Sequence, residues 1–288
     1  MKTFRDYLLR KGEAFNTVRT RENTAKEWME WCESEEIKPK EIKYEQLMNY
    51  VSFCHQKKNT THTIRLKIKS LEHYFSYLEI PQNPAKLVQL KGGTKKLPSN
   101  ILSLEELFEI YTLQTTFGLV EKRNKVLLSL VVFQGVGSSE LRIIELKDVD
   151  LMNGKIYIPA TRTTNSRTLD LQAKQLLLFQ DYIINVRSEI LKEANKSSAY
   201  FLVNHGQGKG VLSNVISALL LKLRMHYPKL KNLQQIRQSV ISEWLKKHGL
   251  RKTQYMAGHR YVSSTERYDI DSFEGLKKEL KSHYLLKK

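Results

Sequence analysis

The stretch from Arg237 to Tyr268 constrains the fold of this chain more than any other segment. Apolar residues recur at helical spacing after Arg237 and stop at a Lys-Lys-His-Gly run, which predicts a buried helix that begins near this arginine. A second, shorter helix over residues 252–257 should end at Gly258, because glycine readily adopts the left-handed conformation that closes a helix. His259 is therefore expected just beyond a helix end.

The residues that follow predict one more helix start. Ser263, Ser264 and Thr265 precede Glu266, and hydroxyl side chains ahead of a glutamate are typical of a helix N-cap. Such a helix would carry Tyr268 on its next turn. The segment thus places one arginine, one histidine and one tyrosine at the ends of helices.

The spacing of Arg237, Gly258-His259 and Thr265-Glu266-Arg267-Tyr268 resembles the C-terminal signature of tyrosine recombinases, the phage-type integrases. In that family the tyrosine hydroxyl attacks a DNA phosphodiester, which gives a 3′-phosphotyrosyl link and a free 5′-hydroxyl. Arginines hold the phosphate, and the histidine moves protons. The resemblance implies that Tyr268, Arg237 and His259 are the catalytic residues of a DNA strand transferase.

The residue types suit this chemistry, although each also has an ordinary structural interpretation. An attacked phosphate gains negative charge, and a guanidinium offers a planar fork of donors that stays charged. A tyrosine hydroxyl is a weak nucleophile until a neighbour accepts its proton. Taken singly, however, Tyr268 would more often be a packing residue and His259 a surface or capping residue. The assignment therefore depends on the joint spacing of the signature.

The chain carries a large excess of positive charge. Its 288 residues include 48 lysines and arginines against 30 aspartates and glutamates, a formal net charge of +18. Both halves are basic, with 19 basic and 12 acidic residues in 1–97 and 29 and 18 in 98–288. A solvated or ribosomal surface can also be basic. Charge spread over two apolar-cored halves favours double-stranded DNA gripped between two lobes.

Helical periodicity dominates the sequence, and one short region alternates like strands. A helix is expected over residues 44–56. A further helix is expected over 64–78, where apolar residues recur every three or four positions. The alternating segments 154–159 and 167–171 flank a polar turn and predict a β-hairpin. The expected fold class is mainly α with a small β-hairpin or sheet.

The resemblance implies the two-domain architecture of tyrosine recombinases. Residues 1–84 would form the helical DNA core-binding domain. Residues 85–98, which contain glycine, proline and lysine, have the composition of a linker. Residues 99–288 would form the α+β catalytic domain.

Basic residues that could contact DNA occur around the third helix, in the linker and in the hairpin. A basic helix face is more often simply solvated. DNA binding by these residues is therefore favoured only because the C-terminal half of the chain resembles a recombinase. The candidate DNA-binding residues are Lys57, Lys58, Arg65, Lys67, Lys69, Lys95, Lys96 and Arg167.

The sequence departs from the family pattern at three places. Gly137 stands where the family has its first catalytic arginine, and Gln234 replaces the histidine of His-x-x-Arg. The predicted hairpin turn lacks the lysine that protonates the leaving 5′-oxygen in the family. Candidate substitutes in the active site are Gln234, Arg142 and Arg162, but glutamine cannot exchange a proton near neutral pH and arginine gives one up reluctantly.

Two main classes of function are therefore open. In the first, the protein is a site-specific recombinase or integrase of the kind that mobile elements carry. In the second, it is a DNA-binding relative with weakened cleavage, which acts as an accessory or regulatory subunit. A type IB topoisomerase, which uses the same phosphotyrosine chemistry, is a more distant third. The sequence does not reveal the DNA site, or whether the reaction is integration, excision or inversion.

Partners other than DNA are expected to be recombinase protomers, in a homo- or hetero-oligomer on the DNA. No metal ligands and no cofactor are expected, because arginines would hold the phosphate. Cys32 and Cys54 are predicted to be buried thiols. Residues 275–286 are predicted to form either an amphipathic basic tail or a frayed basic terminus. No apolar run has the length of a membrane span or signal peptide, so a cytoplasmic protein is expected.

Overall fold

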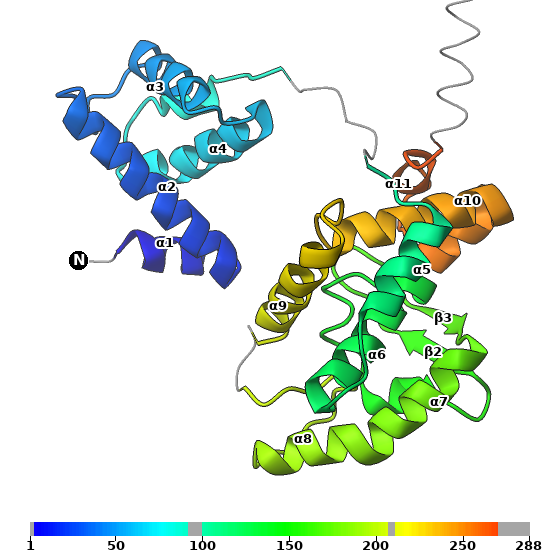
Figure 1. Cartoon of the computed structure of the whole chain (residues 1–288). Coiled ribbons are helices and arrows are strands. Elements are labelled where there is room, and N and C mark those ends of the chain that lie inside the picture. Colours follow the sequence, from blue (N-terminus) through cyan, green and yellow to red (C-terminus); the bar gives the residue numbers. More distant parts are fainter. Residues whose placement is uncertain (1–2, 92–99, 207–210, 270–288) are drawn as a thin grey trace, which may run out of the picture. The chain divides into compact units, whose positions relative to one another are not determined.

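The computed structural model describes residues 3–91, 100–206 and 211–269. The chain forms two compact units, Met1–Lys95 and Lys96–Lys288 (Figure 1). Each unit has its own hydrophobic core. The architecture is mainly helical with one small antiparallel sheet, which confirms the predicted fold class.

The helices of the first unit surround an aromatic core. Trp28 is fully buried, and its ring packs edge-on against Tyr50 and Phe75, with centroids 5.0 and 5.4 Å away. Cys32 and Cys54 are buried free thiols, as predicted. The helices are α1 (Phe4–Arg10), α2 (Phe15–Ser34), α3 (Tyr44–Gln56) and α4 (Thr61–Tyr77).

Residues after α4 belong to the core of the first unit. Ala85, in the 3₁₀ helix η1 (Pro84–Lys86), is buried, and Val88 and Leu90 pack against the same core. Packing therefore continues past residue 84, where a linker was expected to begin. The linker residues Lys95 and Lys96, and the predicted C-terminal tail over 275–286, lie outside the described residues.

Helix α6 (Leu119–Gln134) lies at the centre of the second unit, and most of its side chains are buried. The predicted hairpin consists of β2 (Lys155–Ile158) and β3 (Arg167–Asp170), which pair antiparallel, with Ile158 opposite Arg167. Figure 1 shows both strands between α10 and α7. The other elements are α5 (Leu104–Leu113), η2 (Leu146–Asp148), β1 (Val149–Asp150), α7 (Ala173–Asp181), the π-helix η3 (Tyr182–Val186), α8 (Arg187–Glu193) and α9 (Val211–His226).

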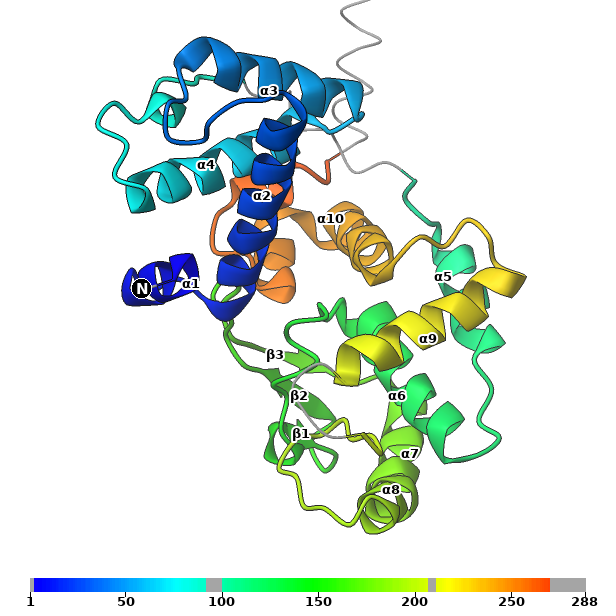
Figure 2. The ribbon, with the colours of Figure 1, turned by 90° about the vertical axis from the view of Figure 1, so that its left-hand side faces the viewer.

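The sheet has the order β1-β2-β3, with β2 in the middle. Figure 2 shows α9 running toward α5, and these two helices are in contact. No helix in the described part of the chain combines the length and the apolar character that crossing a membrane requires.

Helix α10 (Leu233–Ala257) carries the predicted arginine and bends at a glycine. Gly249 has φ 72° and ψ 175°, so the two helices predicted here meet at a kink. Gly258 closes the second one with φ 67°, the left-handed conformation expected. The next helix, α11 (Ser263–Glu266), differs from the prediction, because Val262 occupies the N-cap and no side chain caps the helix.

Truncation of a core residue in α4 should destabilise the first unit. Leu71 is fully buried, so Leu71→Ala should lower the free energy of unfolding by about 2–5 kcal/mol through lost burial and a new cavity. Leu66 on the same helix is 56% exposed, and Leu66→Ala should change it by less than about 0.5 kcal/mol. Urea unfolding of the whole protein measures both. Equal effects of the two substitutions would contradict the burial pattern.

Candidate active site

Arg237 lies in the second turn of α10, and its guanidinium is held inside the second unit. The residue is 6% exposed. Its Nη1 donates to the carbonyl oxygen of Gly135 at 2.6 Å and to Glu140 Oε2 at 2.7 Å. Its Nη2 donates to the carbonyl oxygen of Ala257 at 2.6 Å. These bonds join the start of α10, its C-terminal end and the turn after α6 around one guanidinium.

Glu140 organises this cluster, and its carboxylate is almost fully buried. Oε1 accepts from Arg167 Nη1 at 2.6 Å. Oε2 accepts from Arg237 and from the Gly137 N–H, both at 2.7 Å, and from Arg167 Nη2 at 3.3 Å. Burial alone would raise the pKa of Glu140, but the two guanidiniums and the Gly137 N–H hold that pKa below its ordinary value. The carboxylate therefore stays ionised.

Arg167 is part of this cluster rather than of the surface. It was expected to contact DNA, but its side chain is 0% exposed and its guanidinium pairs with Glu140 at 2.6 Å. The burial of β3 alternates, with Arg167 and Leu169 inward and Thr168 and Asp170 outward. The period of two in the sequence was a signal that Arg167 shares the inner face with Leu169. Sequence analysis missed this role, and also that of Glu140.

Gly137 faces the same two charged groups. A Cβ built on this glycine would lie 3.3 Å from Glu140 Oε2 and 3.5 Å from Arg237 Nη1. The φ of Gly137 is not positive, so the backbone does not require glycine there. The Cα–Cβ bond of a side chain at position 137 would thus point toward the Arg237–Glu140 pair.

The loop that carries His259 is joined to the hairpin. The N–H of Asn165 donates to the Gly258 carbonyl oxygen at 2.8 Å, and Thr164 forms an isolated β-bridge with His259. The Arg260 guanidinium also donates to the carbonyl oxygen of Thr161 at 2.8 Å. The hairpin turn and the His259 loop therefore form one local structure.

The His259 imidazole lies between a hydroxyl and an aromatic ring. Its Nδ1 is 2.8 Å from Thr265 Oγ1, and its ring stacks on Tyr268, with centroids 5.9 Å apart and an interplanar angle of 14°. Burial, and then the positive charges of Arg237, Arg167 and Arg267, lower the pKa of His259 to about 4. The imidazole is consequently neutral at neutral pH.

Tyr268 follows α11 and is 3% exposed. It belongs to a small apolar cluster with Ile241 and Ala257, and its N–H donates to the carbonyl oxygen of Thr265 at 2.9 Å. The tyrosine is also near enough to Arg237 to act on it electrostatically. Arg237, His259 and Tyr268 thus meet at one place.

The three candidate substitutes occupy different surroundings. Arg142 is exposed, and its Nη2 donates to Ser213 Oγ on α9 at 2.5 Å, so its guanidinium is bonded away from Glu140. Arg162 is exposed in the turn between β2 and β3, two residues before Thr164, which bridges to His259. Gln234 is exposed on the first turn of α10, three residues before Arg237.

The basic candidates of the first unit also differ in accessibility. Lys67 is only 14% exposed and pairs with Glu27 at 2.6 Å, so its ammonium is already engaged. Lys69 pairs with Glu72 but is 58% exposed. Arg65 donates to the carbonyl oxygen of Leu90. Lys57 lies over the ring of Phe53, and both it and Lys58 are exposed.

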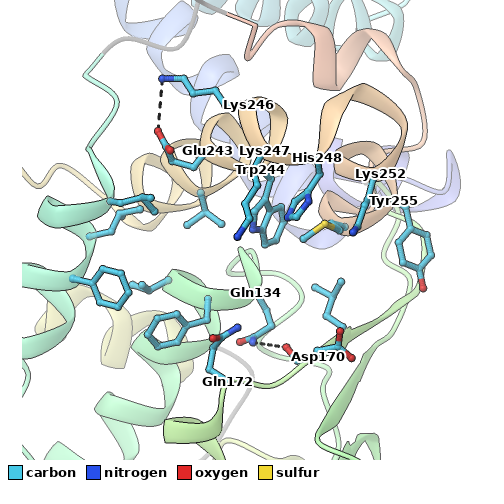
Figure 3. Close-up of a pocket in the computed structure, with 18 of the residues that line it drawn as sticks. Gln134, Asp170, Gln172, Glu243, Trp244, Lys246, Lys247, His248, Lys252 and Tyr255 are labelled. Atoms are coloured by element: carbon cyan, nitrogen blue, oxygen red, sulfur yellow. Dashed lines mark hydrogen bonds and ion pairs between the residues drawn. The ribbon is translucent and has the colours of Figure 1, made fainter.

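A separate groove of about 760 Å³ lies between α5, α6, β3 and α10 (Figure 3). Trp244 and Phe133 are among its apolar lining residues, and Lys247, His248 and Lys252 also border it. Its lining does not include Arg237, His259 or Tyr268. The groove is therefore distinct from the cluster around Glu140.

The stability of the protein should depend on the ionisation of His259. Its pKa is about 4 in the folded chain and about 6.5 in an unfolded one, so the unfolded state binds the proton first. The free energy of unfolding should therefore fall as the pH decreases from about 6.5 to about 4. NMR titration of the imidazole measures this pKa directly.

His259→Asn should remove this component of the pH dependence. His62→Asn, which changes an exposed histidine of the first unit, should leave it in place. An imidazole of His259 that titrates near pH 6.5 would contradict the burial and the charge environment described here.

The model of the Phage integrase family matches residues 100–274. Tyrosine recombinase XerC of Oceanobacillus iheyensis is 22% identical over 299 residues, which covers 98% of this chain and 94% of that protein. XerC of Bacillus licheniformis is 25% identical over 258 residues, which covers 85% and 82%.

Solved structures share the fold at low sequence identity. The XerH site-specific recombinase bound to difH substrate has a TM-score of 0.65 and 18% identity, covering 88% of this chain and 76% of that chain. The Tn1549 transposon integrase in complex with transposon right end DNA has a TM-score of 0.64 and 16% identity, covering 96% and 98%. Since the family model spans more than half of the sequence, this chain belongs to the phage integrase family, the tyrosine recombinases.

Proposed function

We propose that this protein is a site-specific recombinase that cleaves DNA with Tyr268 as its nucleophile. The observation that supports the proposal most directly is the meeting of Arg237, His259 and Tyr268 beside one buried carboxylate. Their separation in the sequence is up to 31 residues, yet the His259 ring stacks on Tyr268 and Arg237 acts electrostatically on both. A nucleophile, a neutral base and a fixed cation are the groups that phosphoryl transfer to a tyrosine requires.

In the proposed reaction, the Tyr268 hydroxyl attacks a DNA phosphodiester. A bond forms between the phenolic oxygen and phosphorus, and the bond from phosphorus to the 5′-oxygen breaks. Negative charge grows on the non-bridging oxygens as this happens. Three of the five N–H donors of Arg237 bond to described residues, so two are available to those oxygens.

His259 is suited to accept the proton of the attacking hydroxyl. Because its pKa is lowered to about 4, the imidazole is neutral and can act as a base at neutral pH. Thr265 bonds Nδ1 and so fixes the ring, which leaves Nε2 without a hydrogen-bond partner among the described residues. A fixed, neutral ring beside the phenol is the arrangement that proton transfer requires.

The leaving 5′-oxygen must also gain a proton, and the hairpin turn contains no lysine to supply it. Arg162 is exposed in this turn, and Arg260 is bonded to it through Thr161. Both guanidiniums stabilise negative charge but donate protons poorly. Loss of one well-placed stabilising group typically lowers the rate by a factor of about 100 to 1,000. Cleavage by this protein is therefore expected to be slow.

Double-stranded DNA is the proposed substrate, and other protomers are the proposed partners. The net charge of +18 favours a polyanion, with affinity that falls as salt rises. Among the similar structures, one holds a lambda integrase dimer bound to a COC′ core site and another a transposon integrase bound to transposon end DNA. We extend this to assembly of protomers on the ends of a mobile element.

A second candidate is an accessory DNA-binding subunit with little cleavage of its own. The observation that favours it is Gly137, which leaves the Arg237–Glu140 pair without a second arginine from the turn after α6. Arg142, close to it in sequence, is bonded to Ser213 instead. The two candidates differ in one measurable property, the formation of a covalent adduct with DNA.

Tyr268→Phe should abolish a covalent protein–DNA adduct without weakening DNA binding, because the substitution removes only the attacking oxygen. The assay traps the adduct on nicked DNA from the ends of the native element, with no added metal. Tyr261→Phe is the matched control, since Tyr261 is 72% exposed and lies in the same loop region. Adduct that survives Tyr268→Phe, or that requires magnesium, would exclude the proposed chemistry.

Gly137→Arg should distinguish a slow enzyme from an accessory subunit. The new side chain would start 3.5 Å from Arg237 Nη1 and supply a second guanidinium to the phosphate. For an accessory subunit, adduct should be scarce before the change and greater after it. Gly137→Ala adds only the Cβ and controls for crowding against Glu140.

An enzyme in which another cation fills the role should cleave before the change and gain nothing from it. Arg142→Ala and Arg162→Ala then identify that cation by loss of rate. Robust cleavage that neither alanine substitution slows would show that the gap at Gly137 has no functional consequence.

A further inference from the structure

Arg167 is buried in a manner that stabilisation alone does not explain. Its guanidinium is bonded to both oxygens of Glu140, yet its Nε has no hydrogen-bond partner among the described residues. An unpaired buried donor is costly, because it has lost its hydrogen bonds to water without gaining others. The contact with Glu140 therefore holds the side chain in a place where its Nε forms no hydrogen bond with the described residues.

Gly258 provides the space for this guanidinium. A Cβ at position 258 would lie only 2.5 Å from Arg167 Nη1 and 2.9 Å from the carbonyl oxygen of Asn165. The glycine also has φ 67°, which other residues adopt reluctantly. Arg167 therefore lies directly against the peptide that precedes His259, and any side chain at position 258 would displace it.

We propose that Arg167 is a positioning residue, which couples the β2–β3 hairpin to the active site by fixing Arg237 through Glu140 and His259 through Gly258. The inference rests on the proposed function, since it assigns a role within that same site. Arg167 was predicted to contact DNA, and this inference assigns it instead to the residues that support the active site.

Charge balance gives this contact a consequence for phosphate binding. Arg167, Arg237 and Glu140 together carry a formal charge of +1. Without Arg167, the Glu140 carboxylate would be shared with Arg237 alone, and the pair would be neutral. In a buried site with little solvent screening, that difference changes the attraction for a phosphate oxygen. Arg167 thereby allows Arg237 to keep a net positive field toward the DNA.

The test uses Arg167→Met in the full-length protein, which keeps the apolar stem and removes the guanidinium. Cleavage of the nicked substrate should slow by about 100-fold, the scale of one lost electrostatic group, while DNA affinity changes less than about threefold. Loss of one positive neighbour should also raise the pKa of His259, on which Arg237, Arg267 and Glu140 still act. NMR titration should then show the imidazole titrating at higher pH.

Arg187→Met is the matched control for loss of a buried arginine. Arg187 is 9% exposed and bonds the carbonyl oxygens of Ser198 and Tyr200, away from Glu140. It should lower the melting temperature without changing the His259 titration or the cleavage rate of the folded protein. If Arg167→Met does not fold, Arg167→Gln replaces it, because the amide can still donate one hydrogen bond to Glu140 but carries no positive charge.

A folded Arg167 variant with wild-type cleavage and an unchanged His259 titration would overturn the inference. The titration is measured without DNA, so it distinguishes this inference from the proposed function. A wild-type protein that forms no adduct would refute the cleavage reaction, whereas a shift of the His259 titration in the variant would still support the positioning role.

Discussion

The ionised carboxylate of Glu140 is the group on which the active-site region depends. It is 1% exposed and accepts hydrogen bonds from two guanidiniums and one backbone N–H. A buried carboxylate is costly unless its charge is compensated. The compensation comes from β3 and from α10, so the charge of one residue holds together segments that are far apart in the sequence.

Two glycines make this arrangement possible by different means. Gly135 ends α6 in the left-handed conformation, and its carbonyl oxygen accepts from Arg237. Gly258 ends α10 in the same conformation, and its missing side chain leaves room for Arg167. Both helix ends therefore turn sharply at the guanidinium cluster. The end of α6 supplies a carbonyl oxygen, and the end of α10 supplies room for a side chain. Two helix ends thus contribute backbone groups and space to the cluster, whose charged side chains come from α10, β3 and the turn after α6.

The electrostatic balance of the site bears both on the proposed proton transfer and on the proposed phosphate binding. Burial, and then the positive charges around it, lower the pKa of His259 and keep the imidazole neutral, which suits a base. Among the described residues, Arg237 is the one cation of this cluster that we propose to hold the phosphate, because Gly137 provides no guanidinium and Arg142 is bonded to α9. The two functions that we propose, an active recombinase and an accessory subunit, therefore differ in whether another cation replaces the arginine missing at Gly137.

The sequence by itself determined the fold class, the family and the identity of Arg237, His259 and Tyr268 as candidates. Helical periodicity, glycine helix ends and signature spacing are local properties, and they can be read along the chain. Tertiary structure decided which charges face each other. Arg167 and Glu140 are 27 residues apart, and their contact exists only because β3 is placed against the turn after α6. Such a pairing depends on packing between distant segments, and no local pattern specifies it.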